Sequence, residues 1–176
     1  MPAAVPQSSE RVIRVLEDEL RQIEQAIADH LQEHHELAQV RQRLCTVPGI
    51  GAKNSLPLLV LVYRWQTLTA GHGHAKGLTA YVGLDPQPCE SGTSVHGHAA
   101  ISRMGNRAAR QQWSMGALGG MRGHNALRTF YQRLVGRGKA KKLALLACAR
   151  KILHWAWAVF VSGRPFDAER HLAASS

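Results

Sequence analysis

Cysteine is scarce in this chain of 176 residues, and its three cysteines stand far apart. Cys45, Cys89 and Cys148 form no CxxC pair, which excludes a disulfide framework and a standard zinc-binding pattern. Isolated thiols are typical of a reducing compartment, and the N-terminal residues lack the basic-then-apolar pattern of a signal peptide. We therefore expect a cytoplasmic protein.

Long hydrophobic runs are also missing. The most apolar stretch, 143–161, is interrupted by Arg150, Lys151 and His154, so we expect no membrane span and no membrane partner. Apolar residues still make up 45% of the chain, which is ordinary for a globular protein and too much for a disordered one. The length fits one domain with an appended element.

Acidic residues are nearly absent from most of the chain. Residues 1–40 hold eight acids and three arginines, whereas residues 41–166 hold eighteen lysines and arginines and two acids, Asp85 and Glu90. A basic body of this kind favours a polyanionic partner, of which nucleic acid is the commonest. The alternative is a basic surface that only keeps the protein soluble.

The first segment contains no glycine, and its pattern predicts one long helix over 9–44 with Ser8 or Ser9 as the N-cap. Its apolar residues recur every three or four positions, at Ile13, Leu16, Leu20, Ile23 and Ile27, and the register continues through His30, His34, Leu37 and Leu44. Such a seam fits a coiled coil that makes a homo-oligomer, or a helix packed on its own domain. We interpret His30, His34 and His35 as seam or surface residues rather than metal ligands.

A Pro-Gly-x-Gly turn follows at residues 47–51. A turn of this composition between two helices resembles the hairpin of helix-hairpin-helix DNA-binding motifs. Gly49 and Gly51 permit positive φ and leave room for a phosphate, and Lys53 adds positive charge at the start of the next helix. Contacts of this kind would not depend on base sequence. The alternative is a plain turn between two helices.

The next region predicts a buried helix over 56–62, a loop over 64–76 and a short helix over 75–82 that ends at Gly83. Residues 83–105 are rich in Gly, Pro and Ser, and predict a long irregular connection or a short hairpin. This segment holds three serines, at positions 91, 94 and 102. The histidines at 72, 74, 96 and 98 form no closed zinc pattern with Cys89, so we expect this chain to bind no metal.

Three further helices are expected, over 106–118 with Asn106 as its cap, over 123–135 and over 139–161. Basic residues gather at the start of the first and the last of them: Arg103, Arg107 and Arg110, and Lys139, Lys141 and Lys142. Lysines in a first helical turn are disfavoured by the helix dipole, which indicates that they face an external anion.

The predicted fold is therefore mainly α, with a long N-terminal helix and a helical domain that contains a helix-hairpin-helix-like turn and a long Gly/Ser-rich loop. The predicted organisation has four parts: a flexible N-terminus (1–8), a helical oligomerisation arm (9–44), a C-terminal domain (45–166) and a flexible tail (167–176).

Five motifs in this order resemble one family. They are VPGIG at 47–51, LTAYVGLDP at 78–86, ESG at 90–92, ISRMGNRAAR at 101–110 and GRGKAKKLALLACARKIL at 136–153. Together they are similar to the C-terminal half of the transposases of the IS-one-ten family of insertion sequences. The resemblance covers about residues 10–168. It implies that the helix 9–44 is part of a coiled coil and that residues 45–166 form a transposase domain.

The resemblance implies a bacterial, nucleoid-associated DNA recombinase guided by a structured RNA. It implies that Ser91 attacks a DNA phosphate to form a covalent phosphoserine link. In this family the divalent metal, expected to be magnesium, is held by an Asp-Glu-Asp-Asp domain that precedes the coiled coil. We expect this chain to lack that domain and to be inactive alone, as an excised fragment or a truncated gene product.

The serine chemistry needs help from neighbouring groups, because a serine hydroxyl is a poor nucleophile at its own pKa. Arginines near the helix start can offset phosphate charge, and His96 or His98 are candidate bases, whereas Glu90 would point elsewhere on an extended segment. Relatives tend to carry arginine or lysine after the serine, where this chain has VHGHA at 95–99. Ser94 and Ser102 stay alternatives to Ser91. The predicted DNA-binding residues are Gly49, Gly51, Lys53, Arg103, Asn106, Arg107, Arg110, Lys139, Lys141 and Lys142.

Two other readings remain open at this point. The chain fits a non-catalytic nucleic-acid-binding module built on the 47–51 turn, and it fits a helical oligomerisation domain whose charge is incidental. If Ser91→Ala in the complete protein loses strand transfer but retains DNA binding, the first alternative is excluded. Salt-dependent DNA binding by the chain would exclude the second alternative.

Overall fold

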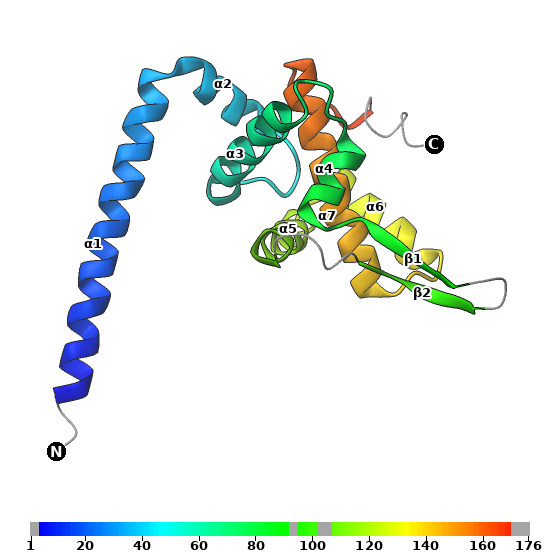
Figure 1. The fold of residues 1–176 in the computed structure, drawn as a ribbon, viewed down its shortest axis with the longest axis horizontal. Coiled ribbons are helices and arrows are strands. Elements are labelled where there is room, and N and C mark those ends of the chain that lie inside the picture. The colour runs from blue at the N-terminus through cyan, green and yellow to red at the C-terminus, as the bar shows by residue number, and fades with distance from the viewer. Residues whose placement is uncertain (1–3, 92–94, 102–106, 170–176) are drawn as a thin grey trace. The chain divides into compact units, whose positions relative to one another are not determined.

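The computed structural model describes residues 4–91, 95–101 and 107–169, with side chains over 8–85 and 109–169. The chain divides into two compact units, Met1–Gln39 and Val40–Ser176. In the described residues the elements are α1 (Ala4–Glu33), α2 (His35–Leu44), α3 (Ala52–Leu68), α4 (Ala75–Val82), β1 (Pro86–Ser91), β2 (Val95–Ile101), α5 (Arg107–Gly120), α6 (Ala126–Gly136) and α7 (Lys141–Ser162), as drawn in Figure 1. The prediction of a mainly α fold is confirmed.

The predicted single helix over 9–44 is wrong in its detail, because α1 and α2 meet at His34, which belongs to neither. The hydrogen-bond ladder nearly continues there: His34 N donates to His30 O at 3.1 Å, and Ala38 N donates to His34 O at 3.2 Å. Consecutive histidines have lower helix propensity than the residues around them, which accounts for a break at this point. Because α1 begins at Ala4, Ser8 and Ser9 lie inside the helix and do not cap it.

The first unit carries an exposed apolar stripe along α1. The large side chains in it are Val12, Ile13, Val15, Leu16, Leu20 and Ile23, each more than half exposed. An amphipathic helix of this kind has charged residues on its other face, such as the exposed pair Asp18 and Arg21 at 2.9 Å.

The second unit is organised around α7, which contacts α4, α5 and α6 (Figure 1). Its buried side chains come from both faces of the helix, and they include Cys148, Ile152, Leu153, Trp155 and Trp157. Burial raises the pKa of the Cys148 thiol to about 11, so this cysteine is an inert packing residue. Other helices supply Leu44, Leu58, Val62, Leu78, Val82, Trp113 and Leu127 to the same core.

Among the described residues, α7 is long and apolar enough to cross a membrane by length and composition. The core helix of a soluble protein meets the same criterion. Nine residues of α7 are buried within the fold, as expected for such a core helix.

The turn between α2 and α3 packs directly on α5 and α7. Gly49 adopts a left-handed conformation with φ of +94°, and a Cβ there would lie 2.7 Å from Ile152 Cδ1 and 2.9 Å from Gly116 O. On the α5 side, a Cβ at Gly120 would lie 2.6 Å from Gly49 Cα. The three glycines therefore let the turn and the helix approach backbone to backbone.

Residues 64–68, predicted as part of a loop, belong to α3, which continues to Leu68. The chain then turns beneath Trp65, because a Cβ on Gly73 or Gly77 would lie 2.6 Å from its ring. His74 begins α4 by accepting a hydrogen bond from Gly77 N at 2.9 Å, and Gly83 ends it with φ of 77°. The prediction of a helix over 75–82 is confirmed.

Within the segment predicted as a long Gly/Ser-rich loop or a short hairpin, the described residues 86–91 and 95–101 form a hairpin. Strands β1 and β2 pair antiparallel, with Pro86 opposite Ile101 and Ser91 opposite Val95. The register shifts between Gln87 and Cys89, which is a bulge in the ladder. Figure 1 shows the two strands extending from the helices of the second unit.

Packing at the 47–51 turn predicts that Gly49→Ala is destabilising. Left-handed strain and overlap with Gly116 O should together lower the free energy of unfolding by about 2–4 kcal/mol. Chemical denaturation followed by circular dichroism measures this change.

Gly51→Ala is the matched control, because Gly51 has φ of −113° and nothing within 4 Å of a built Cβ. The Gly51→Ala substitution should lower the free energy of unfolding by less than about 1 kcal/mol. Equal losses in the two variants would contradict the close-packing argument.

Candidate nucleic-acid interface

A groove opens beside the 47–51 turn, with a volume of about 370 Å³. The turn and the start of α3 form one side, and α5 forms the other. Its lining residues are Gly49, Ile50, Gly51, Asn54, Met115, Gly116, Gly119 and Gly120. Because five of the eight are glycines, much of the groove wall is peptide backbone, which a phosphate or sugar can approach closely.

Several positively charged or N–H-donating groups lie at the start of α3, next to this groove. The first N–H groups of a helix have no intrahelical acceptor, and the helix dipole is positive there. Exposed Lys53 lies in the first turn of α3. Arg41 Nε donates to Ser55 Oγ at 2.9 Å, and Arg41 Nη2 donates to Ala52 O at 3.3 Å, so a guanidinium is held at the same turn. Sequence reasoning missed Arg41, because nothing in the pattern relates it to α3.

A second basic surface surrounds the turn between α6 and α7. We call it the α6–α7 basic cluster; its members are Arg133, Arg137, Lys139, Lys141 and Lys142, all exposed. Gly138 turns the chain with φ of 83°, and Lys139 N donates to Leu134 O at 3.1 Å. Lys139 therefore precedes α7, while Lys141 and Lys142 begin it. Sequence reasoning missed Arg133 and Arg137, although their spacing of four places them on one helix face.

This part of the chain is poor in carboxylates, since the sequence has no Asp or Glu between residues 91 and 166. The pKa of Lys151 is lowered by burial and, secondarily, by the positive charge of Arg133. The Lys151 Nζ lies 5.7 Å from the centre of the Phe130 ring, and Arg133 Cζ lies 5.4 Å from the same ring. Phe130 therefore lies within cation–π range of both positive charges.

One ion pair fixes the base of the hairpin. Asp85 immediately precedes β1, and its Oδ1 accepts a hydrogen bond from Arg150 Nη2 on α7 at 3.0 Å. His154 lies one helical turn further along α7. Its pKa is lowered by burial and by the positive charges of Arg150 and Lys151, while Asp85 opposes that shift. The pair therefore holds the start of the hairpin against the central helix.

Ser91 ends β1 and stands opposite Val95, so its backbone lies at the tip of the hairpin. Across the strands, Glu90 pairs with His96. Arg107 is the first residue of α5, and half-buried Arg110 follows one turn later. Ser94, Ser102, Arg103 and Asn106 lie outside the described residues.

The predicted site residues thus fall into separate places. Gly49 and Gly51 line one groove and Lys53 follows on α3, whereas the three predicted lysines join the α6–α7 basic cluster. Gly49 also has a packing role that sequence reasoning did not foresee. The phosphate-binding role of the 47–51 turn stays a prediction.

Comparison with known proteins adds an independent finding. Residues 41–132 match the family model described as Transposase IS116/IS110/IS902 family. The chain is 32% identical over 160 residues to the pilin gene-inverting proteins of Moraxella lacunata and Moraxella bovis, covering 90% of this chain and 48% of theirs. It is 34% identical over 151 residues to an insertion element IS110 protein of 43.6 kDa from Streptomyces coelicolor, covering 85% of this chain and 35% of that protein.

The chain spans about half the length of the pilin gene-inverting proteins that it matches. The family match extends from the end of α2, through the 47–51 turn and the hairpin, into α6. It therefore includes the groove, the base of the hairpin and Ser91. This chain belongs to the IS110 family of transposases, the IS-one-ten family that its sequence motifs resemble.

Proposed function

We propose that this chain is the DNA-binding part of an insertion-sequence recombinase and supplies Ser91 to a composite active site. The observation that carries the proposal is the concentration of positive charge in residues 41–166, which hold eighteen lysines and arginines against two acids. A surface of this sign attracts the phosphate backbone of nucleic acid and releases its counterions. The relatives named as inverting a pilin gene support DNA rearrangement as the activity.

DNA binding is proposed at two surfaces with different geometry. The groove beside Gly51 presents backbone and the start of α3, which suits one phosphate held by N–H groups and Lys53. The α6–α7 basic cluster presents long flexible cations, which suit several phosphates of a duplex. Both modes are independent of base sequence. A structured guide RNA offers the same phosphates, and support for it comes from the family resemblance.

Catalysis is proposed at the tip of the hairpin. The Ser91 hydroxyl oxygen attacks phosphorus, an Oγ–P bond forms, and the bond from phosphorus to one sugar oxygen breaks. The hydroxyl proton passes to a base, and the departing sugar oxygen takes up a proton. A hairpin tip can reach into a neighbouring domain, whereas its base stays anchored by Asp85 and Arg150.

A four-carboxylate metal site does not fit this part of the chain. Residues 41–166 contain two carboxylates, and one of them, Asp85, is paired with Arg150. The proposal therefore assigns no catalytic step to a metal held here, and it places the family's magnesium in another domain. Without that domain the developing charge on the phosphate is poorly stabilised.

Self-association is proposed through the exposed stripe of α1. Apolar side chains at Leu16, Leu20 and Ile23 follow the three- and four-residue spacing of a coiled-coil seam. Burying the stripe against a second copy removes it from water, which is the driving force for pairing.

The first prediction concerns DNA binding. Replacing Lys139, Lys141 and Lys142 with alanine should weaken binding similarly for all DNA sequences. It should also reduce the slope of log affinity against log salt by about 2–3, since each phosphate contact contributes about 0.9. Fluorescence anisotropy titrations at several salt concentrations measure both effects.

The matched control removes three arginines from the acidic α1: Arg11, Arg14 and Arg21, each to alanine. This variant has the same change in net charge and should keep the salt slope of the original chain. Equal weakening in the two variants would show that total charge, and not the α6–α7 basic cluster, determines binding.

The second prediction concerns assembly. Ile23→Asp places a charge in the α1 stripe and should shift a dimer or larger species towards monomer. Gln22→Asp adds the same charge at a neighbouring exposed position outside the seam, and should leave the assembly unchanged. Light scattering at several concentrations gives the mass, and a monomeric original chain would remove the seam from the proposal.

The third prediction concerns catalysis. The 176-residue chain alone should neither cleave nor join DNA. Supplying a carboxylate-tetrad domain and guide RNA should let a covalent protein–DNA adduct accumulate on Ser91, which mass spectrometry of trapped complexes can locate. Ser91→Ala should abolish the adduct and retain DNA binding.

Ser94→Ala and Ser102→Ala are the matched controls, and each should still form the adduct. An adduct found on either of these serines would reject Ser91 as the nucleophile. Strand cleavage by the isolated chain would reject the composite site.

A further inference from the structure

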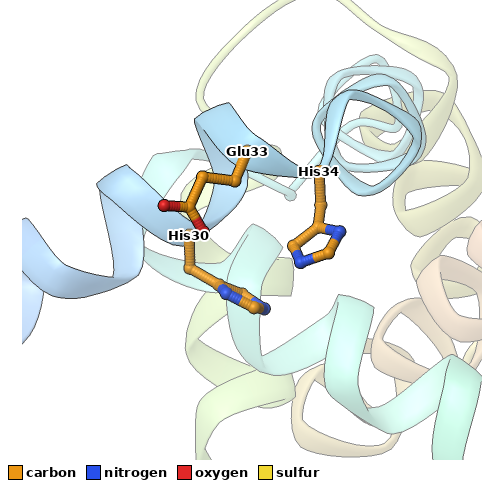
Figure 2. A group of neighbouring side chains, drawn as sticks. All are labelled: His30, Glu33 and His34. Atoms are coloured by element: carbon orange, nitrogen blue, oxygen red, sulfur yellow. The ribbon is translucent and has the colours of Figure 1, made fainter.

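Three potential metal ligands meet at the end of α1. His30, Glu33 and His34 place their ligand atoms within 4.8 Å of one another, and all three side chains are exposed. Figure 2 shows the Glu33 carboxylate beside His30, with the His34 ring near the His30 ring. The two imidazole rings have their centres 4.5 Å apart. All three residues lie in the first unit, so one short segment forms the whole cluster.

Helix geometry explains why these side chains converge. Residues three and four apart lie on the same face of a helix, and His30 is followed by Glu33 and His34 at those spacings. Although His34 lies outside α1, His34 N still donates to His30 O at 3.1 Å, so the i to i+4 relation is preserved. Among the described residues, no side-chain hydrogen bond or ion pair occupies the three ligand groups.

The donor set determines which ions suit the site. Two imidazoles and one carboxylate are ligands of Zn²⁺ and of the neighbouring transition metals, whereas Mg²⁺ and Ca²⁺ prefer oxygen ligands alone. In tetrahedral zinc the ligand atoms lie about 3.3 Å apart, because each is about 2.0–2.1 Å from the metal. Rotation of exposed side chains can close the remaining distance without movement of the helix.

We propose that His30, Glu33 and His34 form a three-ligand site for Zn²⁺ or a similar transition-metal ion, with the fourth position open to water. The proposal departs from the sequence-based interpretation in one respect: these histidines are surface residues that also act as metal ligands. The spacing His-x-x-Glu-His also occurs in some zinc hydrolases. Here the three ligands are exposed, so the inference concerns metal binding and not hydrolysis.

Metal binding has a structural consequence at this place. The ion would link the last turn of α1 to the residue that separates it from α2, and so hold the α1–α2 junction in a helical path. A bound ion stabilises the conformation that binds it by mass action. This inference is independent of DNA binding and catalysis.

The test uses the full chain without a histidine tag and Zn²⁺ as the probe in isothermal titration calorimetry. One ion per chain is expected. His30→Ala and His34→Ala should each weaken binding by at least about tenfold, because even outer-shell partners of a metal site contribute about 10- to 100-fold. Glu33→Gln should weaken it as well. The visible spectrum of the Co²⁺-loaded chain gives a second measurement, which should show a four-coordinate ion.

His35→Ala is the matched control, since His35 is the adjacent histidine outside the cluster. It should bind Zn²⁺ as the original chain does. Circular dichroism verifies that each variant keeps its helix content. Absence of binding to the original chain, one ion per two chains, or full binding by the His30→Ala, His34→Ala double variant would each overturn the proposal.

Discussion

The backbone contact between the 47–51 turn and α5 is the constraint on which the second unit depends. Gly49, Gly116 and Gly120 meet with no room for a side chain, so the start of α3 and the middle of α5 lie together. Just before this turn, Thr46 Oγ1 accepts a hydrogen bond at 2.7 Å from the N–H of Phe166, which lies four residues beyond α7. Arg43 Nη1 adds a bond to Gly163 O at 2.8 Å. Helices far apart in the sequence are therefore joined at one turn.

This contact also creates the groove. The packed glycines Gly49, Gly116 and Gly120 line one part of the groove, and Gly51 and Gly119, where an added Cβ would meet nothing within 4 Å, line another part. The close approach needed for stability thus leaves peptide groups and the positive end of α3 next to solvent. A structural glycine and a proposed ligand-binding glycine lie two residues apart, which is why substitution at each has a different expected effect.

Much of the helical fold could be predicted from the sequence, because its signals are local. The end of the predicted helix 75–82 at Gly83 was correct, because a glycine in a left-handed C-cap is a local signal that does not depend on the rest of the chain. The sequence did not predict the break at His34 or the extension of α3 to Leu68. Where helix propensity is weak, as at His34 and in the Thr-rich segment, tertiary contacts determine whether a residue is helical. The hairpin was left as one of two alternatives, since strand pairing depends on residues across the turn.

The candidate site was less accessible to sequence reasoning, for a physical reason. Lys139, Lys141 and Lys142 were found because they are contiguous, whereas Arg41 and the pair Asp85 and Arg150 act through contacts between distant segments. The Asp85–Arg150 pair is partly exposed, and solvent-screened pairs add little to stability. Its importance is positional, because it links α7 to the residue that precedes the strand carrying Ser91. The central helix that builds the core therefore also sets where the proposed nucleophile's strand begins.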